Sequence, residues 1–198
     1  EHIDVKPLKD IKSGFVKAAQ YSGEDVGVID TSQPDFQVLD KIPETKKALL
    51  EIFNRLNYDL LKYTNKWAIS TSWINVTEKG LDGQVHNHRN CFYSGIFYFD
   101  DYEEEGVAPL EIMTPLQYHG SYQLKRANDM EDTPITLAEQ WVIPPEHQKL
   151  ILFPSYLNHK IGRQKGDKPR YSLAFNIVPI PPYGVADSQA LDLSNVNS

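Results

Sequence analysis

Three histidines and one arginine are the residues of this sequence whose types and spacing could do chemistry. His86 and His88 stand two residues apart in a segment, 84–88, that we expect to be a short strand. Side chains alternate between the two faces of a strand, so both imidazoles should point the same way. His159 follows just after a second expected strand, 149–154. Since neutral imidazole binds iron, copper, nickel and zinc, the three side chains are candidate ligands of one transition-metal ion.

A histidine pair alone is a weak signal, because such pairs also occur on protein surfaces without a metal. The other three histidines are expected in exposed loops or near the terminus, and they are His2, His119 and His147. The C-terminal part of the sequence must therefore supply further evidence for a site.

Arg170 and Ser172 begin an expected strand over 170–178 and share one of its faces with Ala174 and Asn176. An arginine inside a barrel is costly to bury unless an anion meets it. A guanidinium can hold a carboxylate through two parallel hydrogen bonds, and the serine hydroxyl can add a third. Asn176 would hydrogen-bond inside the barrel or orient a ligand histidine. A surface strand with Arg170 in solvent is the alternative that the sequence leaves open.

The spacing of apolar residues indicates the elements that would position these side chains. Apolar residues recur every three or four positions after Pro43, which predicts a helix from about 44 to 64. A shorter helix is expected from Ile11 to Ala19, and 114–145 is expected to be an irregular insertion. Strands are predicted over 67–76, 84–88, 92–100, 107–113, 149–154, 161–162 and 170–178. This order predicts an α+β fold with helices packed on a β-sandwich or jelly roll.

Composition places the chain among ordinary folded proteins and argues against several functions. Its 198 residues are 40% hydrophobic and 24% charged, which suits one domain and excludes wholesale disorder. The net charge of −7 argues against nucleic acid or an anionic membrane as a partner. No signal peptide is expected, and no apolar run approaches the roughly 20 residues of a membrane span. Cys91 is the only cysteine, which excludes an intrachain disulfide and a cysteine-based zinc site and favours a cytoplasmic location.

Five short motifs occur in an order that resembles one enzyme superfamily. They are Trp73-x-Asn75, His86-x-His88, Ser94–Tyr98, Leu152–Ser155 followed by His159, and Arg170-x-Ser172 with Phe175-Asn176. Together they resemble the iron(II)- and 2-oxoglutarate-dependent oxygenases, and more narrowly a bacterial and phage branch that is similar to prolyl hydroxylases. The resemblance implies a double-stranded β-helix, a cupin-like jelly roll, over 67–178. Supporting helices in 1–66 and a tail over 179–198 would complete a single α+β domain.

The resemblance implies that His86, His88 and His159 bind iron(II). The commonest version of this metal site has two histidines and one acid, and here His88 stands where the acid would be. One alternative is that a carboxylate such as Asp100 or Glu111 takes the place of one histidine of the pair. We prefer the set of three histidines.

The resemblance also implies how 2-oxoglutarate is held. Arg170 would bind its distal carboxylate, with Ser172 assisting. Tyr98 matches a tyrosine that prolyl-hydroxylase relatives use on the same carboxylate, and Ser94 lies on the same face of the strand. The alternatives are that Tyr98 is a packing residue of the core and that the Ser94 hydroxyl is buried and bonded to the backbone.

By the same resemblance, we expect an enzyme that hydroxylates an aliphatic C–H bond of an unidentified substrate, such as a prolyl or other amino-acid residue. Arg89 and Asn90, beside the histidine pair, would contact this substrate, as would parts of 114–145 and of the segment before residue 45. The oligomeric state is left open. Two alternatives are a cupin-like metal protein that does not use 2-oxoglutarate and a binding module without metal.

Overall fold

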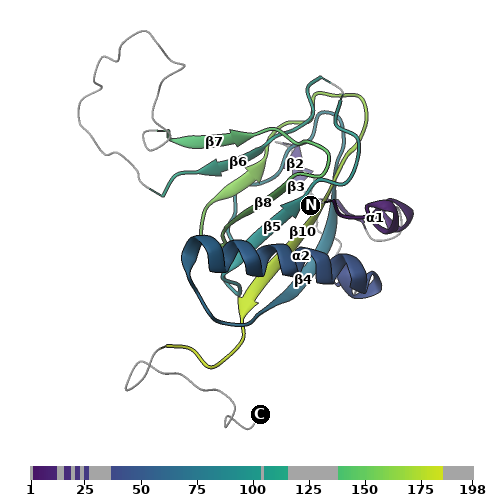
Figure 1. Ribbon diagram of the computed structural model, residues 1–198. Helices are drawn as coiled ribbons and strands as arrows, with labels where there is room; N and C mark the ends of the chain where they lie inside the picture. Colours follow the sequence, from purple (N-terminus) through teal and green to yellow (C-terminus); the bar gives the residue numbers. More distant parts are fainter. Residues whose placement is uncertain are drawn as a thin grey trace, which may run out of the picture.

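The chain folds into three layers, in which helices cover a five-stranded sheet and a three-stranded sheet lies behind it (Figure 1). The computed structural model describes residues 2–12, 37–103, 105–115 and 138–184, and in addition the backbone of 16–18, 21–22 and 25–26. The expected substrate-facing segment 114–145 and the tail 179–198 therefore lie partly outside the described residues.

The larger sheet has the strand order β1-β4-β10-β5-β8, in which strands far apart in the sequence lie side by side. Its strands are β1 (Val16–Ala18), β4 (Trp67–Thr77), β10 (Arg170–Pro179), β5 (Tyr93–Phe97) and β8 (Leu150–Pro154). Only the pair β1–β4 is parallel among these neighbours. The smaller, antiparallel sheet contains β7 (Gln140–Ile143), β6 (Leu110–Met113) and β9 (His159–Ile161) in that order. A separate antiparallel pair joins β2 (Tyr21–Ser22) to β3 (Asp25–Val26).

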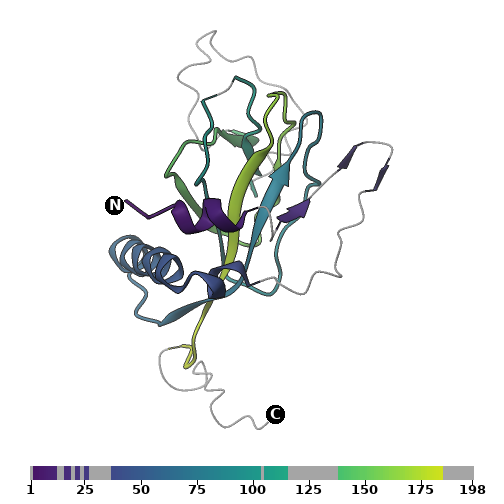
Figure 2. The same ribbon diagram turned by 90° about the vertical axis from the view of Figure 1, so that its right-hand side faces the viewer.

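The helices lie on one side of the larger sheet, as Figure 2 shows for α1 (Lys6–Ile11) and α2 (Pro43–Leu56) beside β10 and β4. A 3₁₀ turn, Val38–Lys41, precedes α2. Pro43 suits the first helical position, where an N–H group has no partner to bond. The helix predicted over 44–64 is thus confirmed at its start. It ends earlier than predicted, because a π-helical turn, Asn57–Leu61, follows α2 and is closed by Lys62 in the left-handed conformation.

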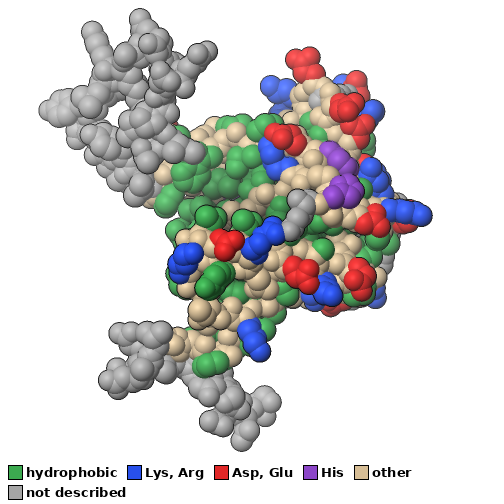
Figure 3. Space-filling view, viewed as in Figure 1, with side chains coloured by type: hydrophobic (Ala, Val, Ile, Leu, Met, Phe, Trp, Pro, Cys, Tyr) green, Lys and Arg blue, Asp and Glu red, His purple; other side chains and the backbone are tan. Residues whose placement is uncertain are grey.

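Two apolar cores separate the three layers. The first lies between the helices and the larger sheet and includes Leu8, Leu49 and Phe53. The second lies between the two sheets and includes Ile96, Leu110, Ile112, Phe153 and Leu157. In the space-filling view, apolar side chains gather over β6, β7 and β8, where the two sheets face each other (Figure 3). Two facing sheets with helices packed outside confirm the predicted α+β double-stranded β-helix with N-terminal supporting helices.

Two local predictions are wrong. The helix expected from Ile11 to Ala19 is absent, since α1 ends at Ile11 and Val16–Ala18 pairs in parallel with β4. The strand expected over 84–88 is reduced to an isolated bridge between His86 and His159. Both errors have the same cause: pairing with a partner distant in the sequence decides the local conformation, and a local pattern does not contain that partner.

Gly95 of β5 is a position where the fold tolerates no side chain. It pairs with Phe175 of β10, and a Cβ atom at residue 95 would collide with the Phe175 ring. We expect Gly95→Ala to lower the free energy of unfolding by about 1–3 kcal/mol, because a packed core relaxes poorly around added volume. Urea denaturation measures this change. Gly80→Ala is the control, because its added methyl group would meet no atom within 4 Å and only the left-handed backbone conformation (φ +83) opposes the substitution. A smaller loss of unfolding free energy in Gly95→Ala than in Gly80→Ala would contradict the prediction.

Candidate metal centre

The backbone brings His86, His88 and His159 together. The N–H of His86 donates to the carbonyl of His159 (3.0 Å), and the N–H of His159 donates back to the carbonyl of His86 (2.9 Å). The N–H of His88 donates to the carbonyl of Ser155, just before His159 on the same side of the barrel. The ring centroids are 4.4 Å apart for His86 and His159, 5.0 Å for His88 and His159, and 5.2 Å for His86 and His88. One ligand atom from each ring lies within 4.8 Å of the others, a spacing at which one metal ion could bind all three.

Each imidazole has its Nδ1 atom engaged by a hydrogen-bond acceptor. His86 Nδ1 lies 2.8 Å from the carbonyl of Gln84, and His159 Nδ1 lies 2.9 Å from the carbonyl of Leu157. His88 Nδ1 lies 2.8 Å from Oδ1 of Asn176. An acceptor at Nδ1 requires the proton to be there, so the lone pair of each neutral ring is on Nε2. In this tautomer, the three imidazoles have three Nε2 lone pairs that can bind a metal.

Burial keeps one of these rings neutral. The side chain of His159 is only 4% exposed and packs against the ring of Phe153. Burial, together with the neighbouring His86 and His88, lowers the pKa of His159 to about 4, although its bond to the Leu157 carbonyl acts in the opposite direction. A ring that is neutral near pH 7 can bind a metal without first losing a proton.

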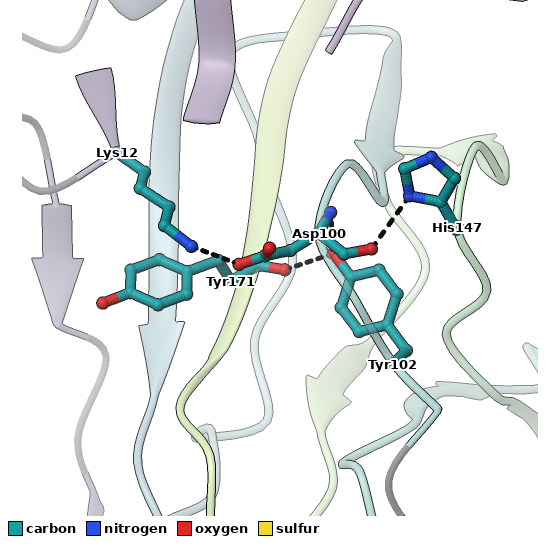
Figure 4. Close-up of polar contacts among 5 residues, drawn as sticks. All are labelled: Lys12, Asp100, Tyr102, His147 and Tyr171. Carbon is teal, nitrogen blue, oxygen red and sulfur yellow. Dashed lines mark hydrogen bonds and ion pairs between the residues drawn. The ribbon is translucent and has the colours of Figure 1, made fainter. Parts of the chain in front are cut away.

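The carboxylates considered as alternative ligands are engaged elsewhere. Asp100 forms an ion pair with Lys12 (2.6 Å), in a network that also contains Tyr102, His147 and Tyr171 (Figure 4). Glu111 pairs with Lys160 (3.3 Å). Within the described residues, the cluster that could hold a metal contains the three histidines and no acid. The geometry therefore favours three histidines over a set that includes Asp100 or Glu111.

Arg170 lies at the start of β10 and is only 1% exposed. Its Nη1 donates to the hydroxyl of Ser172 (3.1 Å), and its Nη2 donates to the hydroxyl of Tyr98 (2.9 Å). Its Nε is buried and has no hydrogen-bond partner. No carboxylate of the described residues forms an ion pair with it. The guanidinium is therefore a buried charge held by neutral hydroxyls, and an entering carboxylate would neutralise it and accept from its remaining N–H donors.

The structure brings together three of the four residues predicted to hold 2-oxoglutarate. Tyr98 and Ser172 both contact Arg170, and Tyr98 is fully buried. Ser94 lies elsewhere: its hydroxyl contacts His88 Nδ1 (2.9 Å), Asn176 Oδ1 (3.1 Å) and the hydroxyl of Ser155. Strand parity places Ser94 and Tyr98 on one face, but four residues span about 13 Å along a strand. Ser94 is thus at the metal end of the site.

A cavity of about 490 Å³ opens next to the segment that follows His88. Its lining carries no charged side chain, and its aromatic and amide residues are Tyr63, Trp67, Phe92, Tyr183, Asn65 and Asn90. Of the two residues predicted to contact the substrate, Asn90 lines this cavity, while Arg89 is exposed and does not.

Sequence reasoning missed the hydroxyl groups around His88. Ser155 contacts Ser94 and receives a hydrogen bond from the thiol of Cys91, and Thr71 receives one from Asn176. No motif could have linked these residues, because β4, β5, β8 and β10 bring them together only in the folded sheet.

A comparison with known families decides to which class this site belongs. The model of the family described as "Putative 2OG-Fe(II) oxygenase" matches residues 71–176, more than half of the chain. The chain belongs to this oxygenase family. The matched stretch contains the three histidines, Tyr98 and Arg170. Iron(II) and 2-oxoglutarate are the metal and cosubstrate of the 2OG-Fe(II) oxygenases, and the histidine cluster and the unneutralised guanidinium fit both.

Three solved structures match this chain at low sequence identity. An oxidoreductase of the 2OG-Fe(II) oxygenase family from Burkholderia pseudomallei is 13% identical (TM-score 0.45), and the match covers 65% of this chain and 55% of that one. A prolyl-4-hydroxylase from Pseudomonas putida is 12% identical (TM-score 0.47; 73% and 67% covered). A prolyl hydroxylase from Trichoplax adhaerens, in complex with a hypoxia inducible factor peptide fragment, is 14% identical (TM-score 0.48; 87% and 74% covered). The chain thus spans about half the length of the first of these relatives. No curated protein sequence matches it.

Among the described residues, no helix of the chain is both long and apolar enough to cross a membrane.

Proposed function

We propose that this protein is an iron(II)- and 2-oxoglutarate-dependent dioxygenase that hydroxylates an aliphatic C–H bond. The observation that carries the proposal is the coexistence of three imidazoles with available Nε2 atoms and a buried guanidinium that lacks a counter-ion. Either feature alone suits several protein classes. Together they provide a metal site and an anion site on the inner surface of one barrel.

Each residue has a defined task in this reaction. His86, His88 and His159 hold the metal, and Arg170 with Ser172 and Tyr98 holds the distal carboxylate of 2-oxoglutarate. When bound, iron(II) supplies the chemistry by which dioxygen and 2-oxoglutarate give succinate, carbon dioxide and a hydroxylated substrate. Three neutral ligands leave the charge of the metal uncompensated, which favours a dianionic cosubstrate. The apolar core around Ile96, Tyr98 and Phe153 excludes water from the anion site.

The primary substrate binds, in this proposal, in the cavity lined by Asn90. The N–H of Phe92 bonds to the carbonyl of Ile177, so the pairing of β5 with β10 continues one step beyond Ser94 and Asn176, which contact His88. Phe92, which lines the cavity, is thus two residues, roughly 7 Å along the chain, from Ser94. An uncharged lining rich in aromatic residues favours an uncharged, apolar group, such as a prolyl or other aliphatic amino-acid residue.

A single-turnover experiment tests the proposed function. Protein loaded anaerobically with one equivalent of iron(II) and excess 2-oxoglutarate is exposed to dioxygen, and succinate is quantified. We expect about one succinate per bound iron. Bound iron with intact 2-oxoglutarate would instead favour the cupin-like metal protein. Absence of iron binding would favour the binding module. Either outcome would reject the proposal.

The phenol of Tyr98 is expected to contribute to 2-oxoglutarate affinity. Its hydroxyl accepts a hydrogen bond from the buried Nη2 of Arg170, so its own proton can be donated to an entering carboxylate. Tyr98→Phe removes that donor while keeping the ring. Losing one hydrogen bond to a charged group costs about 1.5–3 kcal/mol, so the Kd for 2-oxoglutarate should rise roughly 10- to 100-fold. Isothermal titration of the manganese(II)-loaded protein measures the change. Tyr58→Phe is the control, because Tyr58 is exposed and lies on the turn after α2; equal affinities in both variants would contradict the assignment.

A further inference from the structure

Asn176 lies on β10, and its carboxamide contacts the imidazole of His88. Its Oδ1 lies 2.8 Å from His88 Nδ1 and accepts a hydrogen bond from the hydroxyl of Ser94 (3.1 Å). Its Nδ2 donates to the hydroxyl of Thr71 on the neighbouring strand β4 (2.9 Å). Three strands of the larger sheet, β4, β5 and β10, therefore fix this one carboxamide.

The direction of the carboxamide determines what His88 can do. With Oδ1 toward the imidazole, Nδ1 must carry the proton and Nε2 keeps its lone pair for a metal. The reverse orientation would place the Nδ2 donor at Nδ1, and the imidazole proton would then move to Nε2 and block metal binding. In the structure Oδ1 faces the imidazole and also accepts from the Ser94 hydroxyl, while Nδ2 donates to the Thr71 hydroxyl.

His88 differs from the other two histidines in this respect. The acceptors for His86 and His159 are the backbone carbonyls of Gln84 and Leu157, each two residues before the ring that it holds. His88 Nδ1 instead contacts two side chains from other strands, the carboxamide of Asn176 and the hydroxyl of Ser94. Substitution of Asn176 therefore changes a contact that reaches the imidazole of His88 directly.

We propose that Asn176 is the positioning residue of the third metal ligand, which it holds as the Nδ1–H tautomer so that Nε2 faces the metal. The inference rests on the proposed use of His88 as a ligand, but not on the use of 2-oxoglutarate. Asn176 contributes no atom to the metal. It acts through the imidazole, as groups around metal ligands commonly do, and substitution of such groups lowers metal affinity about 10- to 100-fold.

Substitutions at Asn176 separate this role from a packing role. Asn176→Leu keeps the branching of the side chain and removes the acceptor. Asn176→Asp keeps an acceptor at the same position. The first readout is the tautomer of His88, measured from the ¹⁵N NMR signals of the histidine rings in the metal-free protein. The His88 signals are those that disappear in His88→Gln. The second is the Kd for cobalt(II). We expect His88 to be the Nδ1–H tautomer in the wild type and in Asn176→Asp, and a mixture of tautomers in Asn176→Leu.

The same series gives the affinities that decide the inference. The Kd for cobalt(II) should rise about 10- to 100-fold in Asn176→Leu and change less than about threefold in Asn176→Asp. Thr71→Val removes the hydroxyl that accepts from Asn176 Nδ2. It should change the His88 tautomer and the Kd for cobalt(II) in the same direction as Asn176→Leu, but by less. This variant replaces Asn176→Leu in the test if Asn176→Leu does not fold. Asn57→Leu is the matched control: Asn57 is a buried amide on the turn after α2 whose Nδ2 donates to the carbonyl of Tyr63, and the tautomer of His88 should not respond.

Two results would overturn the inference. One is an unchanged tautomer and cobalt(II) affinity in Asn176→Leu or, failing that, in Thr71→Val. The other is an Asn176→Asp variant that loses as much affinity as Asn176→Leu, since a retained acceptor would then be irrelevant. Failure of the proposed function would look different: cobalt(II) would bind and the tautomer would respond as expected, but 2-oxoglutarate would not be converted to succinate.

Discussion

Arg170→Met is expected to abolish tight 2-oxoglutarate binding while the metal site stays intact. Arg170 is 1% exposed, its partners are the hydroxyls of Ser172 and Tyr98, and its Nε has none. Removing one partner of a buried, hydrogen-bonded charge pair costs about 2–5 kcal/mol, which corresponds to a Kd about 30-fold to several thousand-fold higher. Isothermal titration with 2-oxoglutarate on the manganese(II)-loaded protein measures this loss.

The same substitution should leave the free energy of unfolding of the metal-free protein unchanged or raise it. Without cosubstrate, the guanidinium is a buried charge with no counter-ion, and methionine fills a similar volume without the cost of desolvation. The substitution should therefore lower the affinity for 2-oxoglutarate without lowering the free energy of unfolding. Substitution of an arginine with a purely structural role would not give this combination. Arg163→Ala is the control, because Arg163 is exposed. Undiminished 2-oxoglutarate affinity in Arg170→Met would show that another group binds the anion.

His86→Ala and His159→Ala are each expected to reduce the affinity for iron(II) or cobalt(II) by more than about 100-fold. Each removes one of three ligand atoms, which should cost more than the 10- to 100-fold loss seen when only a supporting group is removed. His86 is exposed, so its loss opens no hole in the core, whereas His159 is buried against Phe153. The two variants should thus differ in stability but agree in metal affinity.

His147→Ala is the matched control for both histidine variants. His147 is exposed, lies outside the cluster and donates to the backbone carbonyl of Asp100 (Figure 4). Cobalt(II) titration followed by visible absorption should give the wild-type affinity for this variant. If His147→Ala weakened binding as much as His86→Ala, the metal would not be held by the proposed cluster.

Strand periodicity predicted the inner face of β10 well. Arg170, Ser172 and Asn176 share one face, as alternation requires, and they follow one another along β10 from the buried guanidinium to the contact with His88. Periodicity could not predict distance along that face. Ser94 was therefore grouped with Tyr98 and Arg170, although it bonds to His88 at the other end of the site.

Contacts between distant segments account for most of what the sequence did not predict. The sequence left Asp100 and Glu111 open as ligands, because the lysines that engage them, Lys12 and Lys160, belong to other elements. The paired backbones of His86 and His159 likewise replaced the expected strand over 84–88. Motif order was informative in spite of this, because side-chain chemistry is encoded locally and the pairing that assembles it is not.

The central claim is that three histidines and one arginine bind one metal ion and one 2-oxoglutarate molecule. The most direct test is anomalous diffraction at the iron edge from crystals grown anaerobically with iron(II) and 2-oxoglutarate. We expect one anomalous peak within bonding distance of Nε2 of His86, His88 and His159, with a carboxylate of 2-oxoglutarate on the guanidinium of Arg170. A peak that any of the three rings fails to reach, or a cosubstrate carboxylate bound away from Arg170, would contradict the claim.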